Sequence, residues 1–269
     1  MDLKELHEKL FDMLVMFDGI CKKHNIRYFL DSGAAIGAVR EHDFIPWDDD
    51  IDVAITRSDY NKLRRILKKE LPSYYKLIEP KDYDPYFYDM VPKLIDMDVP
   101  LRKEADEDRA YKNYQNRMSI DFFILDSVPD NILLQKVIIF RTKVIYGLMR
   151  SKRYSSSTQM QMTLFEKMAS SVLKVAGNLF SLKLLRNMYL HNTMKYANEK
   201  SETYIINNYQ LCFLMCFKKE WFSDVVYFDF HGKRFPLPVG YDRILAQIYG
   251  DYMTPKKDYK GFIKHFDEK

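Results

Sequence analysis

The sequence is poor in cysteine and contains no long apolar run. Its three cysteines lack the second ligand pair that a zinc site needs, and their number is odd. We therefore expect Cys21, Cys212 and Cys216 to be free thiols in a reducing cytoplasm. No stretch reaches the roughly eighteen uncharged apolar residues of a membrane span. The opening residues, MDLKELHEKL, lack the apolar segment of a secretory signal.

Several familiar catalytic motifs are also missing. The chain has no Walker A, GxGxxG, HExxH or GxSxG pattern, which weakens the ATPase, dinucleotide-dependent, zinc-protease and serine-hydrolase interpretations. Hydrophobic residues make up 47% and charged residues 30% of the chain, as in an ordinary globular protein with a sizeable core. No internal repeat is visible. The function therefore has to be inferred from local patterns.

Residues 28–60 combine a strand, a small-residue helical segment and an acidic strand. The apolar run Ile26–Leu30 predicts a buried strand. Ser32 and Gly33 then open a small-residue helical segment, Ala34–Arg40. The first backbone N–H groups of a helix have no partner within it, so they are suited to holding a phosphate.

Four aspartates follow and give the strongest chemical signal: Asp48, Asp49, Asp50 and Asp52. Side chains alternate between the faces of a strand, so Asp50 and Asp52 should share a face while Ile51 enters the core. Two carboxylates on one face repel each other unless a cation lies between them. Oxygen-only ligands suit Mg²⁺, with Mn²⁺ as an alternative, and Mg²⁺ suits phosphoryl chemistry.

The helical segment and the acidic strand together predict half of a phosphoryl-transfer site. In it, a phosphate-binding helix start, called the phosphate seat below, would lie beside a metal-binding group of carboxylates. The simpler alternative is a solvated acidic turn, because a DxD pair alone is a weak signal. A calcium-binding loop fits poorly, since the acids lack the spacing and the glutamate of an EF-hand.

A third carboxylate is expected from Asp121, which lies inside the apolar strand Ile120–Leu125. A lone aspartate in a buried strand is costly unless it is paired or binds a metal. We predict that Asp121 is a metal ligand, a general base for an acceptor hydroxyl, or both. A hydrogen-bonded structural aspartate is the competing interpretation.

Three cations are candidates for neutralising donor phosphates. Lys93 interrupts the apolar strand Val91–Ile95, and Arg102 follows in the next turn. Arg40 closes the helical segment, where it could instead hold the acidic loop through a charge-assisted pair.

Other elements follow from simple periodicity. Apolar residues recur at helical spacing from Leu3 to Cys21. Thr56 with Asp59 predicts the start of a second helix, which ends near Leu71. We interpret its five cations as a solvated face: Lys62, Arg64, Arg65, Lys68 and Lys69. A hairpin is expected over 227–237 with its turn at His231-Gly232, which makes His231 a turn residue rather than a base.

Residues 131–200 have helical periodicity and a strong positive charge. They hold twelve Lys or Arg against two Glu, a net charge of +10. Such a segment could lie on an anionic membrane surface, hold a lipid-linked or anionic glycan acceptor, or form an ordinary helical subdomain. No nucleic-acid module appears, so we expect no nucleic acid partner. Ser155–Thr158 is expected to be a loop.

The stretch SGAAIGAVREHDFIPWDDDIDVAITRSDY resembles the signature of the LicD family, which is also similar to the catalytic part of fukutin-like proteins. The matching residues are Gly33, Gly37–Arg40 and Ile45–Asp52. Ala34 departs from the pattern, where a threonine is usual. Near the other end, the sequence YGDYM at Tyr249–Met253 follows a proline-bearing strand and a helix, as in LicD-like chains.

The resemblance implies an α+β fold with a polymerase-β-like nucleotidyltransferase core, in which helices flank a mixed sheet. We divide the chain accordingly into a catalytic core over 1–130, a basic helical insert over 131–200, and strands and a helix over 201–269 that complete the core. Family members transfer phosphocholine or an alditol phosphate from a CDP-activated donor to a cell-surface glycan such as teichoic acid, lipopolysaccharide or capsule.

The residue patterns, together with the resemblance, assign roles. The expected metal ligands are Asp48, Asp50, Asp52 and Asp121, of which the last three are catalytic. The expected substrate contacts are Ser32, Gly33, Gly37, Arg40, Lys93 and Arg102. One alternative is a nucleotidyltransferase that releases pyrophosphate, and another is a non-catalytic metal-dependent glycan- or membrane-binding protein. We expect a cytoplasmic location, either free or peripheral at the inner face of the membrane.

Overall fold

The computed structural model describes residues 1–154, 164–197, 200–206 and 215–255. The expected loop Ser155–Thr158 and Cys212 lie outside these ranges, whereas Cys21 and Cys216 are free thiols. Within the described residues, no helix combines the length and the apolarity needed to cross a bilayer.

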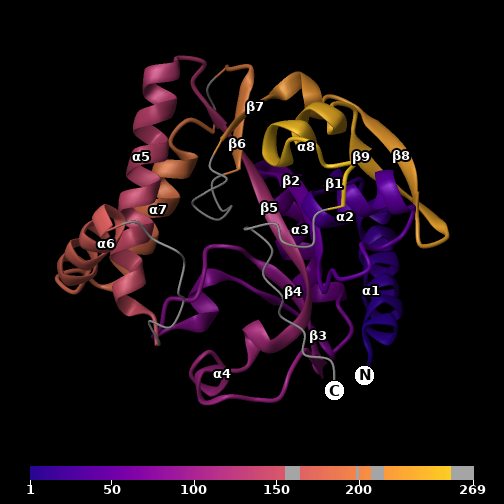
Figure 1. Ribbon diagram of the computed structural model, residues 1–269, viewed down its shortest axis with the longest axis horizontal. Helices are drawn as coiled ribbons and strands as arrows, with labels where there is room; N and C mark the ends of the chain where they lie inside the picture. The colour runs from indigo at the N-terminus through magenta and orange to yellow at the C-terminus, as the bar shows by residue number, and fades with distance from the viewer. Residues whose placement is uncertain (155–163, 198–199, 207–214, 256–269) are drawn as a thin grey trace.

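A mixed seven-stranded sheet forms the centre of the molecule (Figure 1). Five strands follow the order β1-β2-β5-β4-β3, in which only β2 and β5 are parallel. The far end of β5 pairs with β6, which pairs with β7. The strand bounds are Tyr28–Leu30 (β1), Ile51–Thr56 (β2), Tyr75–Ile78 (β3), Lys93–Pro100 (β4), Arg117–Val128 (β5), Thr203–Ile206 (β6) and Cys216–Lys218 (β7).

Helices cover both faces of this sheet, so the α+β class with a mixed sheet is confirmed. Figure 1 shows α5, α6 and α7 together on one side of the molecule, with α1 and the β8–β9 hairpin on the other. The helix bounds are Leu3–Lys23 (α1), Ser32–Ile36 (α2), Arg57–Glu70 (α3), Asp106–Ala110 (α4), Ile132–Met149 (α5), Leu164–Gly177 (α6), Leu182–Met194 (α7) and Tyr241–Tyr249 (α8).

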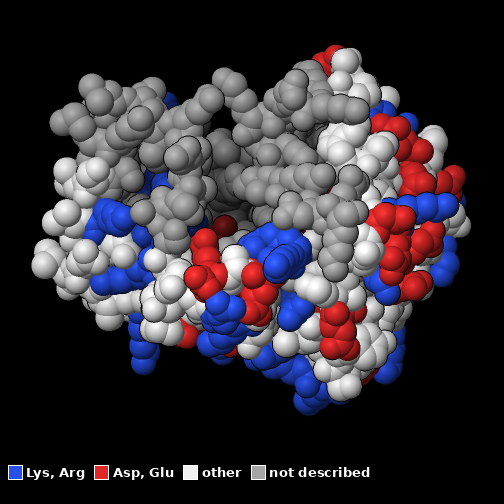
Figure 2. All heavy atoms as spheres, turned by 60° about the horizontal axis from the view of Figure 1, so that its bottom comes forward, with Lys and Arg blue, Asp and Glu red and all other residues white. Residues whose placement is uncertain are grey.

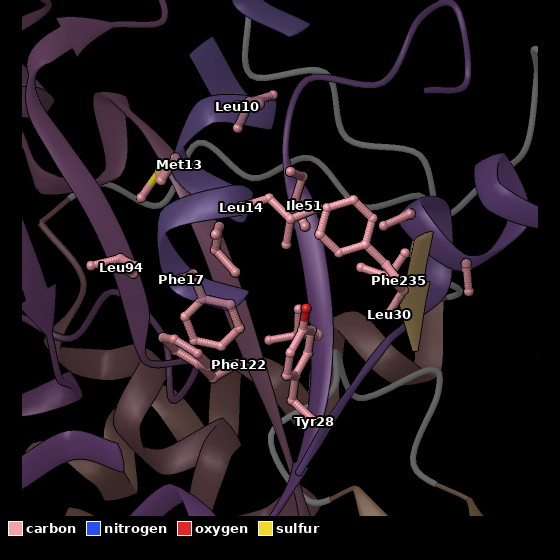
Figure 3. Packing of buried hydrophobic residues seen from close by; sticks show 14 of the residues in the cluster. Leu10, Met13, Leu14, Phe17, Tyr28, Leu30, Ile51, Leu94, Phe122 and Phe235 are labelled. Carbon is pink, nitrogen blue, oxygen red and sulfur yellow. The ribbon is translucent and has the colours of Figure 1, made fainter. Parts of the chain in front are cut away.

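Helix α1 packs along one face of the sheet, as its apolar periodicity predicted. Asp2 caps it by accepting a hydrogen bond from the Glu5 backbone N–H at 2.7 Å. Its buried side chains, including Leu14 and Phe17, belong to the same core cluster as Ile51 of β2 (Figure 3). This burial directs one set of alternate side chains on β2 and β5 toward α1 and leaves the other set for the opposite face.

The opposite face carries a second apolar layer farther along the same strands. Ala54 of β2 and Leu125 of β5 pack with Ile206 of β6 and with Ile244 and Ile248 of α8. Asp52 and Asp121 precede these residues on the same strands and face. The carboxylates therefore lie where the apolar layer on this face ends.

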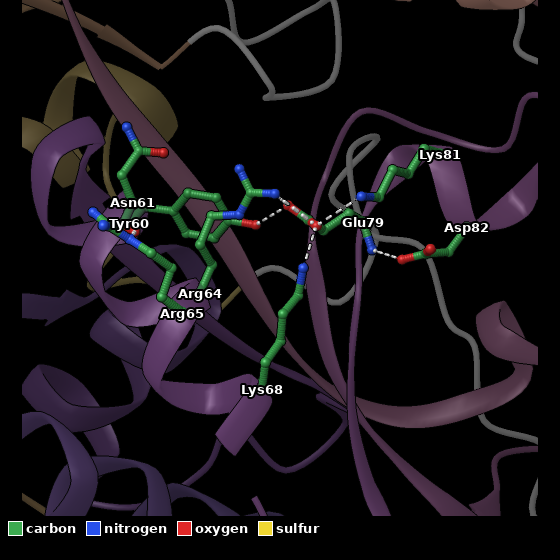
Figure 4. A network of polar contacts seen from close by, with 8 residues as sticks. All are labelled: Tyr60, Asn61, Arg64, Arg65, Lys68, Glu79, Lys81 and Asp82. Carbon is green, nitrogen blue, oxygen red and sulfur yellow. Dashed lines mark hydrogen bonds and ion pairs between the residues drawn. The ribbon is translucent and has the colours of Figure 1, made fainter. Parts of the chain in front are cut away.

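Helix α3 begins as predicted, with the Thr56 hydroxyl accepting from the Asp59 backbone N–H at 3.2 Å. The interpretation of its cations as a solvated face is partly wrong. Arg64 and Lys68 form ion pairs at 2.9 and 3.5 Å with Glu79, a buried carboxylate that follows β3 (Figure 4). The charge of Glu79 in this buried position needs such partners.

The region after β5 is helical, as expected. Helix α7 runs alongside α5, where Asn192 donates hydrogen bonds to Thr142 Oγ1 at 2.9 Å and to the Ile138 carbonyl at 3.2 Å. Tyr146 and Leu185 pack against Phe87 from the segment before β4. The proposed division at residues 130 and 200 stays a prediction.

The expected hairpin consists of β8 (Val225–Phe230) and β9 (Lys233–Pro238), with the turn at His231-Gly232. Both turn residues have positive φ, 49° and 81°, which matches the twist of a two-residue hairpin loop. His231 is thus a turn residue, and its ring also bonds Asp43 Oδ1 at 2.7 Å.

Candidate functional site

The parallel pair β2–β5 brings the predicted carboxylates together. Asp52 lies directly opposite Asp121 in the strand register, and Asp50 immediately precedes β2. One oxygen from each of Asp50, Asp52 and Asp121 lies within 4.8 Å of the other two. Ile51 is fully buried on the other face, as the alternation predicted. The structure therefore assembles the acidic cluster that was expected, while the roles of its members stay predictions.

The electrostatics of this cluster are unfavourable without a cation. Burial, followed by repulsion from neighbouring carboxylates, raises the pKa of Asp50 and of Asp52 well above the usual aspartate range. Burial and the charge of Asp49 raise the pKa of Asp48 to about 7. Three convergent carboxylate oxygens fit the all-oxygen coordination of Mg²⁺ or Mn²⁺, and a divalent cation would offset the repulsion.

Asp121 is held by two donors. Lys93 Nζ lies 2.5 Å from Asp121 Oδ2, and Ser119 Oγ donates to Asp121 Oδ1 at 2.7 Å. Burial lowers the pKa of Lys93, but the Asp121 carboxylate more than offsets this and raises it well above its ordinary value. The Lys93 ammonium therefore places a positive charge directly beside the acidic cluster, while the role of Asp121 as metal ligand, general base or both stays a prediction. Each oxygen keeps a lone pair for a metal.

The turn from β1 into α2 lies against the acidic loop. A Cβ added to Gly33 would meet Asp48 Oδ2 at 2.2 Å, so only glycine allows this approach. Ser32 is buried with a positive φ of 45°, and the Asp31 side chain makes no capping bond to α2. The predicted phosphate seat thus directly adjoins the aspartates.

The helical segment predicted over 34–40 is interrupted. Helix α2 ends at Ile36 and a π-helical turn, Gly37–Glu41, follows it. A Cβ added to Gly37 would lie 2.5 Å from the Asp43 carbonyl oxygen, so this glycine allows the chain to fold back closely. The structure therefore gives Gly37 a packing contact, and a substrate contact stays a prediction.

Arg40 and Arg102, which were expected near the donor phosphates or the acidic loop, bind other groups of the chain. Arg40 donates to the Tyr252 carbonyl oxygen and to Glu41 Oε1, both at 2.7 Å, so the suggested pair with the acidic loop is wrong. The bond to Tyr252 connects the YGDYM sequence to the π-helical turn. Arg102 makes two bonds of 2.6 Å to Asp108, and among the described residues no contact joins it to the aspartates.

Several residues at the site escaped the sequence analysis. His7 bonds the Asp48 carbonyl oxygen at 2.8 Å and stacks on Phe44 with ring centroids 4.3 Å apart. Asp49, which the sequence analysis named without giving it a role, is buried, and its carboxylate lies with those of Asp48 and Asp50. Of the residues not named, only Ser119 had a visible signal, because it lies two residues before Asp121 and so shares its face of β5. No local pattern indicates the contact from α1.

The comparisons with known proteins match the part of the chain that contains this site. Residues 25–143 match the family model described as "LicD/FKTN/FKRP, nucleotidyltransferase domain". Residues 25–143 are thus similar to a LicD-family domain. This region, called the LicD domain below, contains the four aspartates, Lys93 and the α2 turn, and it runs into α5.

Two relatives differ in how much of the chain they cover. The lipopolysaccharide cholinephosphotransferase LicD of Haemophilus influenzae is 28% identical over 269 residues, which covers 96% of this chain and 94% of that protein. An uncharacterized protein of Rickettsia prowazekii is 38% identical over 58 residues, 22% of each chain. The similarity to the first relative therefore extends well beyond the LicD domain.

Proposed function

We propose that this protein is a metal-dependent phosphotransferase that moves phosphocholine from a CDP-activated donor to a cell-surface glycan and releases CMP. The observation that carries the proposal is the cluster of Asp50, Asp52 and Asp121 on the parallel pair within the LicD domain. The name of the Haemophilus relative supports phosphocholine as the transferred group and lipopolysaccharide as the class of acceptor. An alditol phosphate is the alternative group.

The residues divide the work as follows. Asp50, Asp52 and Asp121 would hold a divalent cation, with Asp48 beside them, and the cation would neutralise charge on the donor diphosphate. Lys93 and Ser119 fix the direction of the Asp121 carboxylate through their hydrogen bonds. Backbone N–H groups at the start of α2 orient a phosphate oxygen. The acceptor hydroxyl attacks the phosphorus in line, loses its proton to a carboxylate of the cluster, and displaces CMP. The core that supports this chemistry is, on this proposal, of the polymerase-β type.

One assay tests both the donor and the type of reaction. The pure protein is incubated with CDP-choline, CDP-ribitol or CDP-glycerol, with and without Mg²⁺, in the presence of an acceptor glycan, and CMP is measured. Metal-dependent CMP release from CDP-choline supports the proposal, and release from a CDP-alditol instead changes the transferred group. Pyrophosphate from CTP would favour a nucleotidyltransferase. No CMP from any donor would favour a non-catalytic binding protein.

The first prediction concerns Asp52. We expect Asp52→Asn to reduce CMP release by at least about a thousand-fold, because charge stabilisation by the cluster is the main catalytic contribution. The fold should persist, since the substitution removes a repelling charge. Asp98→Asn, at an exposed aspartate of β4, is the matched control and should turn over normally. Turnover of Asp52→Asn within a few-fold of wild type would refute the metal assignment.

A further inference from the structure

Helix α5 has an apolar outer face that no element of the described residues covers. Its inner side packs through Ile138 and Met149, which are buried. On the outer side Leu133, Val137 and Phe140 are 71%, 43% and 68% exposed. Residues three and four apart lie on the same side of a helix, so these three form one continuous stripe. Single exposed apolar residues are common, but a contiguous stripe indicates a surface that binds something.

Cations border this stripe on both sides. At about 100° per residue, Lys136 and Lys143 lie along one edge and Arg141 along the other. All three are exposed, and none has an acidic partner among the described residues. The whole of α5 contains no Asp or Glu. In Figure 2, basic and uncharged residues predominate on the side where α5–α7 lie, while acidic residues gather toward the middle and the opposite side.

We propose that this α5 outer face, Leu133, Val137 and Phe140 bordered by Lys136, Arg141 and Lys143, docks on the surface of an anionic lipid bilayer. The apolar stripe enters the boundary between headgroups and acyl chains, and the cations contact lipid phosphates. The inference concerns only the outer face of this helix and does not depend on the chemistry proposed for the LicD domain.

Charge complementarity selects this occupant. A second copy of the chain bound through the same face would bring its cations against identical cations, with no acid on either helix to pair with them. A nucleic acid or a glycan would satisfy the cations but leave the apolar stripe in water. An anionic bilayer offers hydrocarbon to the apolar stripe and, at the same time, lipid phosphates to the cations on either side of it.

The test is vesicle co-sedimentation of the full chain, with phosphatidylcholine alone and with phosphatidylcholine containing phosphatidylglycerol. We expect binding to the anionic vesicles that weakens as salt increases. Lys136→Gln/Arg141→Gln/Lys143→Gln should weaken it by roughly a hundred-fold, or about five-fold for each charge removed. Lys62→Gln/Arg65→Gln/Lys69→Gln, three exposed cations of α3, is the matched control and should bind normally.

The apolar stripe is tested separately with Phe140→Ser. We expect it to weaken vesicle binding by roughly ten-fold, and Tyr74→Ser, at an aromatic side chain that is 46% exposed, to have no effect. All these positions are exposed, so the variants should fold, and metal-dependent CMP release in solution should be unchanged. No binding to anionic vesicles, or equal binding by the outer-face and control variants, would overturn the proposal. So would a dimer in solution that Phe140→Ser dissociates.

Discussion

At the scale of single residues, Asp121 illustrates how a buried charge is kept in place. Its carboxylate has Lys93 on one oxygen and Ser119 on the other, and both side chains of the ion pair are about nine-tenths buried, at 12% and 9% exposed. Neither charge would be tolerated there alone. The pair therefore links the chemistry of the site to the stability of the sheet.

Lys93→Met should show this link directly. Leaving Asp121 without its partner should cost about 3–5 kcal/mol in the free energy of unfolding. Denaturant titration measures this cost, and the double variant Lys93→Met/Asp121→Leu should recover most of it, because two apolar side chains replace the pair. CMP release should be lost in both variants. Lys76→Met, at an exposed lysine of β3, is the control and should cost under about 1 kcal/mol. Normal stability of Lys93→Met would contradict the argument.

At the scale of elements, the decisive contact is that between the start of α2 and the acidic loop. Their approach depends on Gly33, where a side chain would overlap Asp48. The approach also sets the distance between the predicted phosphate seat and the aspartates. Because Gly33 has no side chain, this one residue determines both the packing of α2 against the acidic loop and the distance from the phosphate seat to the aspartates.

Gly33→Ala should move Asp48 or α2 and so destabilise the fold by about 1–3 kcal/mol. CMP release should fall more than stability alone explains, because the phosphate seat shifts relative to the metal. Adding Asp48→Ala should restore stability without restoring the full rate. Gly19→Ala in α1 is the matched control, since its Cβ would have nothing within 4 Å, and it should stabilise by about 0.5–1 kcal/mol. A wild-type rate in Gly33→Ala would argue against the phosphate seat.

The elements that could be predicted are those with local signals. The spacing of apolar residues gives α1, the Thr56 cap gives the start of α3, and His231-Gly232 gives the hairpin turn. The alternation around Ile51 predicts the face on which the carboxylates lie. Asp121 could be named as the third carboxylate only because a buried aspartate needs a partner and because the family resemblance includes a similar acid-bearing strand. Its position opposite Asp52 on a parallel strand was not predicted.

What could not be predicted depends on long-range contacts. Arg40 reaches the Tyr252 carbonyl, Arg64 reaches Glu79, and His7 reaches the acidic loop from α1. The partner of a cation is set by how helices and strands pack, and no spacing in the sequence carries that information. The same reason explains why Arg102 was expected near the donor although it binds Asp108.

At the scale of the whole molecule, the β8–β9 turn fastens the C-terminal hairpin to the N-terminal half. The ring of His231 lies 2.7 Å from Asp43 and 3.3 Å from Glu8 of α1. Burial lowers the pKa of His231, but its bonds to Asp43 and Glu8 outweigh this and raise the pKa above the usual value of 6.5. The protonated ring therefore holds three distant segments together.

The stability of the fold should consequently depend on pH through this residue. A raised pKa means that the His231 contribution is fully present below about pH 6.5 and is lost as pH rises through the higher pKa of the folded state. We expect wild type to be more stable than His231→Asn at low pH, and this difference in the free energy of unfolding to decrease over the interval. The decrease should be about 1 kcal/mol or less, because both acids are half exposed. Thermal or denaturant unfolding at several pH values measures it, and a difference that does not change with pH would exclude the contact.

The parallel pairing of β2 with β5 also has a consequence for how the protein is made. The two strands are separated in the chain by α3, β3, β4 and α4, and such distant pairings form slowly. During synthesis, Asp50 and Asp52 leave the ribosome well before Asp121 and remain on a strand whose final neighbour does not yet exist. On the proposed metal assignment, the complete cluster could not bind its cation until β5 has been synthesised and has paired, so metal binding would serve as a direct signal that β2 and β5 have come together.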